Sequence, residues 1–311
     1  MFIQISALIL GLAMLLGGAN ALVDGSTSLA RKTGVSEFVI GLVIVGFGTS
    51  FPELIVSVTG ALSHNSDISV GNVIGSNVFN TSLILAVSAM FAPIVITRQN
   101  KFRDIPVTIL VTFLVAFLGY NGGLNRTEGF VMIVLFAIYI FWSFRTDASA
   151  SDGKQEDAKE FSVSAALFLV AGGLACLIFG GNLFVRSAEA IARILGVSDK
   201  FIAITILAMG TSLPEFVTSI VALAKKRGQL ALGNILGSNV FNLLLILGVS
   251  AIITPTSFAR IDVWDYVALL LSIILVWTGI YTGKKDELDR VDACLLLLLF
   301  VAYMTKLFIN L

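Results

Sequence analysis

Two glutamates lie inside otherwise apolar segments of this chain, each at the end of the same short motif. The segment Gly48–Glu53 (GTSFPE) returns as Gly210–Glu215 (GTSLPE), 162 residues later, with five of the six residues identical. An ionisable side chain inside a bilayer is costly, and by default it indicates a function. The carboxylates of Glu53 and Glu215 are therefore the first candidates for chemistry.

The groups around each glutamate predict a site made of oxygen donors. Pro52 has no backbone N–H, so the carbonyl of Gly48 loses its helical partner, and the proline before Glu215 has the same effect on its own helix. Thr49 lies four residues before Glu53 and so shares its helical face. Carboxylate, hydroxyl and carbonyl oxygens suit Ca²⁺ or Na⁺, and not soft transition metals.

A second repeated motif adds neutral polar groups. The segment Gly71–Asn80 returns as Gly233–Asn242 with eight of ten residues identical. Its Asn and Ser side chains recur every four residues, and this stripe could coordinate a cation through amide and hydroxyl oxygens. The same pattern is also compatible with simple packing, because small residues at this spacing let helices approach closely and polar ones bond to a neighbour. The stripe consists of Asn72, Ser76, Asn80, Asn234, Ser238 and Asn242.

Composition requires a lipid environment for these motifs. The sequence is 57% hydrophobic and 13% charged, with a mean hydropathy of +0.96, and a soluble chain of 311 residues could not hide that much apolar surface. The 20 basic residues balance the 20 acidic ones, which excludes an electrostatic footprint for nucleic acid. The N-terminal segment before residue 20 has no Lys or Arg, so we expect a long helix there and no cleavable signal peptide.

Hydropathy predicts an all-α integral membrane protein with ten transmembrane helices, because about 20 apolar residues are needed to cross the hydrocarbon core. The one sizeable polar stretch, residues 146–160, is a charged, Ser/Ala-rich segment that we expect to be a linker. It separates two five-helix repeats, residues 1–145 and 161–311. The spans are expected near residues 2–28, 36–62, 69–92, 104–120, 127–145, 161–190, 198–224, 231–254, 262–282 and 289–309.

Five spans in each repeat predict that the two repeats have inverted topology. The loop charges agree, because residues 225–227 (KKR) stand where the first repeat has residues 63–65 (SHN). Both termini are then outside the cell (plasma) membrane and the linker is cytoplasmic. Of the 20 basic residues, this topology assigns 14 to the cytoplasmic side: Arg31, Lys32, Arg98, Lys101, Arg103, Arg145, Lys154, Lys159, Lys225, Lys226, Arg227, Lys284, Lys285 and Arg290.

Inverted repeats that pack about a pseudo-twofold axis would bring all four motif segments together near mid-membrane. A single Glu beside Pro could be a structural kink, but repetition of the whole constellation favours a binding site. Gly11 and Gly18 recur as Gly173 and Gly180, which indicates either close packing of the first and sixth spans or faces along which they slide. Asp24 has no counterpart, and we expect it to be solvated at a helix end.

The paired motifs, Gly-Thr-Ser-x-Pro-Glu and then Gly-Asn-x-x-Gly-Ser-Asn, resemble the alpha repeats of the cation/calcium exchanger (CaCA) superfamily. The similarity is greatest to its prokaryotic sodium/calcium exchangers, and it covers essentially the whole chain. The proton-coupled branch usually has Gly-Asn-x-x-Glu in the third span, whereas Gly75 and Gly237 of this chain are followed by Ser.

The resemblance implies which residues bind cations. It makes Glu53 and Glu215 the main Ca²⁺ ligands, with Asn80 and Asn242 closing the site. Some relatives carry Asp at one of these last two positions, and this chain has Asn at both. The other ligands that it implies are the hydroxyls of Thr49, Ser50, Thr211, Ser212, Ser76 and Ser238 and the backbone carbonyls near Gly46 and Ala208.

The implied activity is secondary antiport of Ca²⁺ against Na⁺, with the first and sixth spans sliding to alternate access. A proton-coupled antiporter of the same fold stays open, because a Glu in an apolar cavity can be protonated. A cation channel fits less well, because such pores usually carry an open row of charges. No nucleophile–base pair or His-based metal motif is visible, so we expect no enzyme. The expected partners are Ca²⁺, Na⁺ or H⁺ and the lipid bilayer, with no cofactor and a functional monomer.

Overall fold

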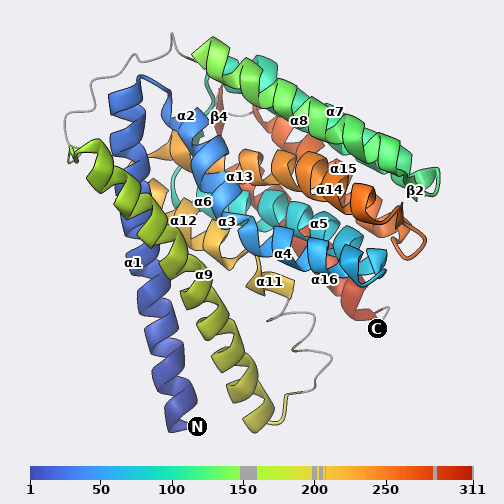
Figure 1. Ribbon diagram of the computed structural model, residues 1–311, viewed down its shortest axis with the longest axis horizontal. Helices are drawn as coiled ribbons and strands as arrows, with labels where there is room; N and C mark the ends of the chain where they lie inside the picture. Colours follow the sequence, from blue (N-terminus) through green and yellow to red (C-terminus); the bar gives the residue numbers. More distant parts are fainter. Residues whose placement is uncertain (148–159, 198–201, 203–205, 207, 283–285, 310–311) are drawn as a thin grey trace.

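The computed structural model is a bundle of helices, and the part of the chain that it describes also contains four very short strands (Figure 1). It describes residues 1–147, 160–197, 202, 206, 208–282 and 286–309. The helices before residue 148 are α1 (Phe2–Thr33), α2 (Glu37–Ile40), η1 (Gly41–Gly46), α3 (Phe47–Thr49), α4 (Phe51–Leu62), α5 (Ser66–Phe79), η2 (Asn80–Ile84), α6 (Leu85–Phe91), η3 (Asn100–Asp104), α7 (Ile105–Tyr120) and α8 (Arg126–Asp147). Those after residue 160 are α9 (Val163–Ile194), α11 (Ala208–Gly210), α12 (Leu213–Ala224), α13 (Gly228–Val240), η5 (Phe241–Ile246), α14 (Leu247–Ile253), α15 (Val263–Gly279) and α16 (Arg290–Ile309).

Several of these helices are long enough to cross a bilayer, some of them only together with the helical segments that continue them. Within the described residues, seven helices are sufficiently long and apolar, and the bent pair Glu37–Thr49 and Phe51–Leu62 makes up to eight. Two shorter apolar helices, Leu213–Ala224 and Val263–Gly279, lie within the predicted seventh and ninth spans. The chain is therefore an all-α, multi-pass membrane protein, and the count of ten spans stays a prediction.

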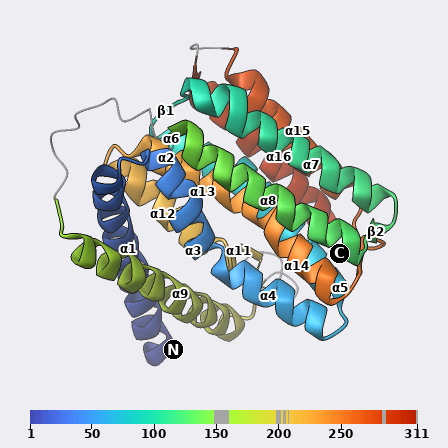
Figure 2. The same cartoon turned by 45° about the horizontal axis from the view of Figure 1, so that its top comes forward.

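Helices α1 and α9 lie side by side at one edge of the molecule, next to the short helices α2, α3 and α12 (Figures 1 and 2). They run antiparallel: a Cβ added at Gly18 would lie 2.8 Å from the Gly173 carbonyl oxygen, and one at Gly11 would lie 2.9 Å from that of Gly180. The two backbones touch because these positions lack side chains. The predicted glycine faces are therefore turned toward each other, which favours close packing of the pair.

Two antiparallel ribbons tie the two parts of the chain together. Strand β1 (Ile94–Val95) pairs with β4 (Glu287–Leu288), and β2 (Gly123–Leu124) pairs with β3 (Thr256–Ser257). Gly123 has φ of 135°, and a Cβ there would lie 1.9 Å from the Thr256 carbonyl oxygen, so this ribbon requires glycine. Each ribbon thus joins one loop of residues 1–145 to one loop of residues 161–311.

The helices next to the predicted linker extend slightly beyond the expected boundaries. Helix α8 continues to Asp147, two residues into the segment expected to be a connector. Helix α9 begins at Val163, where the Ser162 hydroxyl accepts a hydrogen bond from the Ala165 amide at 3.2 Å. Residues 148–159, which make up most of the predicted linker, lie outside the described part of the chain.

Asp24 stays partly exposed, but it also forms an ion pair, which the expectation of solvation did not include. The Lys225 ammonium nitrogen lies 2.6 Å from an Asp24 carboxylate oxygen, and Arg227 pairs with Glu37 at 3.0 Å. Both ion pairs connect helices near the N-terminus to the loop between α12 and α13. The Asp24 pair joins residues 201 positions apart, and helix-end patterns in a sequence give no sign of such a partner.

Candidate cation-binding site

Both glutamate motifs fold as interrupted helices. The axis bends by 49° between Glu37–Thr49 and Phe51–Leu62. The break falls at Ser50, with φ of −82° and ψ of 9°, and Ser212 has nearly the same backbone conformation, with φ of −88° and ψ of 6°. In each motif the proline occupies the first turn of the helix after the break, where its missing N–H costs little. The carboxylate therefore begins a new helix directly beside the hydroxyls of the preceding one.

The two motifs meet and bond to each other. The Ser50 hydroxyl donates to Glu215 Oε1 at 2.8 Å, and the Ser212 hydroxyl donates to Glu53 Oε1 at 3.2 Å. Each carboxylate is thus held by a serine 159 or 165 residues away. Both glutamates and both serines are fully buried. The structure therefore brings together these four predicted site residues.

Further hydroxyls surround the same carboxylates. Thr211 lies within hydrogen-bonding reach of Glu53, and Thr49 and Ser238 lie within reach of Glu215. The Ser238 hydroxyl also approaches the Gly46 carbonyl oxygen at 3.3 Å. Hydroxyl and carbonyl oxygens from both motifs therefore line one buried region.

The second motif braces the interrupted helices. The Asn72 amide nitrogen donates to the Glu53 backbone carbonyl at 3.1 Å and to the Ser57 hydroxyl at 3.0 Å. In the other copy, Asn234 donates to the Glu215 carbonyl at 3.2 Å and to Ser219 at 2.9 Å. These two asparagines of the expected polar stripe bond to the backbone of the glutamates. Other members of the stripe, such as Ser238, lie beside the carboxylates instead.

Ser57 and Ser219 are further polar positions beside the candidate site, and the two motifs do not include them. Each accepts the amide of a bracing asparagine, and both are fully buried. A signal for them exists in the sequence, since they stand 162 residues apart, one turn after each glutamate. Matching the two repeats beyond the motifs would have found them.

Asn80 and Asn242 lie in π-helical turns at the ends of the second motif. Asn80 begins η2 and Asn242 is the second residue of η5. A π-helical turn inside an α-helix frequently occurs at a functional site. Sequence periodicity did not predict these turns, because hydropathy does not distinguish a wide turn from a regular one.

Several buried polar atoms of this region have no hydrogen-bond partner among the described residues. They are Oε2 of Glu53 and of Glu215 and both amide atoms of Asn80 and of Asn242. Leaving such atoms unpaired in the protein interior costs about 1–3 kcal/mol each, and more for a charged group. A coordinated cation would offset this cost for the oxygens, so the donor set fits a bound cation as cargo.

Glycines let the second motif approach the first interrupted helix. A Cβ at Gly46 would lie 3.0 Å from the Ser238 amide nitrogen, one at Gly237 would lie 2.7 Å from Leu42, and one at Gly233 would lie 2.2 Å from the Phe38 carbonyl. These contacts confirm helix packing for the glycines of the second copy. They also fix Ser238 beside the Gly46 carbonyl.

The two remaining predicted ligands have simpler descriptions. Ser76 is buried on α5. Ala208 begins α11, three residues before Thr211, in the position that Gly46 occupies in the first copy. Among the described residues, no group of three or more His, Cys, Asp or Glu side chains could hold a metal ion. The site offers two carboxylates and several neutral oxygens as donors, and such a donor set suits a hard cation.

Residues 3–145 and 165–309 match the family model described as sodium/calcium exchanger protein. The chain belongs to this family. Among curated relatives of this exchanger chain, the putative antiporter CaxA of Alkalimonas amylolytica is 36% identical, covering 96% of this chain and 97% of the relative. The sodium/calcium exchanger MaX1 of Methanosarcina acetivorans is 30% identical over 97% of both.

The exchanger chain also resembles solved structures. The sodium-calcium exchanger NCX_Mj, soaked with Na⁺ in the absence of Ca²⁺, superposes with a TM-score of 0.86 at 32% identity, over 98% of this chain and 99% of that one. This similarity confirms the expected membrane-exchanger fold. It also places the chain in a family of transporters.

Proposed function

We propose that this chain is a secondary antiporter that exchanges Na⁺ for Ca²⁺ by alternating access to one buried site. The observation that carries the proposal is the reciprocal bonding of Glu53 and Glu215 to serines of the opposite motif, with one oxygen of each carboxylate unpartnered. The names of the exchanger relatives support the same ions. No catalytic residue or cofactor is part of this proposal.

The coupling follows from shared occupancy of a doubly charged cavity. Two carboxylates neutralise a single Ca²⁺, or share several Na⁺ ions with neutral oxygens. An empty cavity with two uncompensated charges should resist crossing the dry barrier, because burying charge without a partner is costly. The proposed ligands are Glu53, Glu215, Thr49, Ser50, Thr211, Ser212, Ser76, Ser238, Asn80 and Asn242, with the carbonyls of Gly46 and Ala208.

The proposed topology has ten helices in two inverted five-helix repeats, residues 1–145 and 161–311. Its support is the antiparallel packing of α1 against α9 and the matched bonds that Asn72 and Asn234 make. The distribution of Lys and Arg over the loops favours both termini outside and residues 146–160 in the cytoplasm. A monomer in the plasma membrane completes the proposal.

Uptake of ⁴⁵Ca²⁺ into vesicles tests the function when gradients of Na⁺, K⁺ and H⁺ are imposed separately. We expect uptake driven by an outward Na⁺ gradient alone. Uptake driven by a pH gradient without Na⁺ would instead favour the proton-coupled antiporter. Flux that needs no counter-gradient would indicate a channel.

The cross-motif serines should matter for Ca²⁺ affinity. Replacing Ser50 or Ser212 by Ala removes the hydrogen bond that orients the opposite carboxylate. A hydrogen bond to a charged group contributes about 1.5–3 kcal/mol, so we expect Ca²⁺ to bind at least about tenfold more weakly. Isothermal titration of the purified protein measures this, with Ser63→Ala as an exposed control. Unchanged affinity in both variants would contradict the proposed site.

The Asp24–Lys225 ion pair connects α1 to the residue that follows α12. If α1 and α9 move as a unit, α1 must shift relative to α12 and this pair must change. The pair is partly exposed, so it contributes no more than about 1 kcal/mol. We expect Asp24→Lys alone to change the exchange rate by about two- to fivefold. The charge-swapped double variant, Asp24→Lys with Lys225→Asp, should return toward the wild-type rate. A swap that restores nothing would show that the pair does not contribute.

A further inference from the structure

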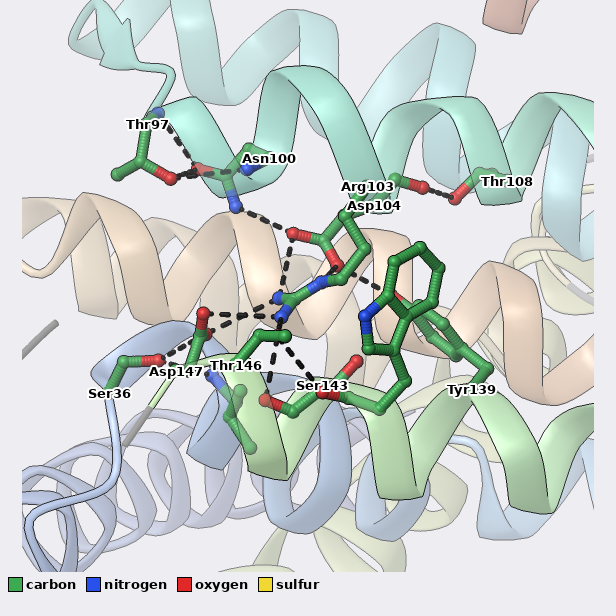
Figure 3. Close-up of polar contacts among 12 residues, drawn as sticks. Ser36, Thr97, Asn100, Arg103, Asp104, Thr108, Tyr139, Ser143, Thr146 and Asp147 are labelled. Atoms are coloured by element: carbon green, nitrogen blue, oxygen red, sulfur yellow. Dashed lines mark hydrogen bonds and ion pairs between the residues drawn. The ribbon is translucent and has the colours of Figure 1, made fainter. Parts of the chain in front are cut away.

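A second buried polar cluster lies away from the cation site, around Arg103 (Figure 3). Its guanidinium group bonds to Asp104 through Nε at 2.8 Å and to Asp147 through Nη1 at 3.2 Å. The three side chains come from η3 and from the end of α8, and all are buried. Charges in such a place need full pairing, because taking them out of water costs several kcal/mol each.

The remaining oxygens of this cluster are also satisfied. Tyr139 donates to Asp104 at 3.0 Å, and Asn100 donates to its other oxygen at 3.2 Å. The Ser36 hydroxyl donates to Asp147 Oδ2 at 2.8 Å. Two carboxylates face one guanidinium, so these neutral donors supply the compensation for the second negative charge. A fully bonded network of this kind holds its members in one geometry.

Ser36 connects the cluster to the first interrupted helix. Its hydroxyl oxygen accepts a hydrogen bond from the Val39 amide at 3.2 Å, so it is the N-cap of α2. The next residue, Glu37, pairs with Arg227 at 3.0 Å. The start of α2 is thus fixed from two sides, by the end of α8 (Figure 3) and by the loop after α12.

Helix α2 continues through η1 and α3 to the break at Ser50. Gly46 and Thr49 therefore lie about 15–20 Å along this segment from Ser36, at about 1.5 Å per residue. A helical segment fixed at its start keeps its axial position at its far end. The hydroxyls that this end presents, Thr49 and Ser50, both reach Glu215.

We propose that Arg103, Asp147 and Ser36 are positioning residues for the cation site. They anchor the start of α2, and so set the place of the Gly46 carbonyl and of the hydroxyls that bond to Glu215. This inference rests on the proposed cation site, and it assigns the positioning of that site to residues that are not themselves ligands. It predicts that loosening the anchor weakens cation binding without removing any ligand.

The anchor belongs to one half of the chain only. The repeat carries Arg103 onto Asp265, Asp104 onto Tyr266 and Asp147 onto Ile309, so no matching ion cluster can form from these positions. The ligand motifs themselves are repeated almost without change. The two interrupted helices are therefore held in place by different contacts. The cluster around Arg103 anchors only the first of them, whose Thr49 and Ser50 hydroxyls reach Glu215.

Substitutions at Ser36 separate capping from anchoring. Ser36→Thr keeps both the acceptor for Val39 and the hydroxyl donor for Asp147. Ser36→Asp keeps the cap, since aspartate is a good N-cap residue, but it places a carboxylate against Asp147. Ser162→Asp is the matched control, because Ser162 caps α9 in the same way at an exposed position.

The full-length chain, purified in detergent, is titrated with Ca²⁺ and its thermal unfolding is recorded. We expect Ser36→Asp to weaken Ca²⁺ binding by about five- to tenfold, and Ser36→Thr and Ser162→Asp to stay within about twofold of wild type. Wild-type Ca²⁺ affinity in Ser36→Asp would overturn the proposal. So would a loss of affinity no greater than that of Ser162→Asp.

A second substitution keeps the test decisive if Ser36→Asp does not fold. Asp147→Ala removes the anchor and leaves the Ser36 cap intact, and it should weaken Ca²⁺ binding by a similar factor. Unchanged affinity in this variant would also overturn the proposal. Wild-type protein that takes up no Ca²⁺ under a Na⁺ gradient would count against the proposed function instead, so the two failures are distinguishable.

Discussion

Replacing Glu53 by Gln should abolish Na⁺-driven Ca²⁺ uptake, and Glu215→Gln should do the same. Each substitution keeps the shape of the side chain but removes one of the two charges that neutralise Ca²⁺ in a fully buried site. Removing one member of a desolvated charged pair costs about 2–5 kcal/mol, which corresponds to a loss of at least about 30-fold in affinity. Uptake of ⁴⁵Ca²⁺ into vesicles, with Ca²⁺ titration of the purified variants, measures both effects.

Glu189→Gln is the control for these variants. Glu189 lies near the end of α9 and pairs with Arg193 four residues later, in a partly exposed ion pair. We expect this variant to transport at the wild-type rate. If Glu53→Gln and Glu215→Gln also transported normally, the buried carboxylates would not be the ligands, and the shared-cavity mechanism would have to be abandoned.

Replacing Gly18 by Leu should have the second large effect, a loss of both folding stability and transport. A Cβ at this position would lie 2.8 Å from the Gly173 carbonyl oxygen and 2.9 Å from the Cys176 side chain. Filling such a contact forces the backbones of α1 and α9 apart, and overpacking of this kind costs about 1–3 kcal/mol or more. Thermal unfolding of the purified protein and vesicle uptake measure the two losses.

The neighbouring residue provides a matched control. Gly17 is exposed, and a Cβ there would meet nothing within 4 Å among the described residues. Gly17→Leu should therefore unfold and transport like the wild type, since a bilayer accepts an added apolar side chain. If the two substitutions had equal effects, the loss would come from replacing a glycine within the helix. It would then not come from crowding the contact between α1 and α9.

The membrane environment and the type of side-chain chemistry can be predicted from the order of residues alone. Hydropathy predicted a multi-pass helical membrane protein, and the family comparison and the long apolar helices confirm it. Pro52 predicted an interrupted helix, because a missing N–H breaks the local hydrogen-bond ladder whatever surrounds it. The repeated glutamates predicted a site for hard cations, since a buried carboxylate needs a partner wherever it lies. These are local properties, and they can be found along the chain.

Which groups meet depends on how the helices pack against one another. That Ser50 bonds to Glu215 and not to Glu53, that Asn72 braces a backbone carbonyl, and that Asp24 has a partner all depend on contacts between residues far apart in sequence. The cluster around Arg103 could not be predicted either, because its members are single charged or polar residues without repeat or motif. Packing brings such residues together, and their bonds follow from the geometry of the assembled helices.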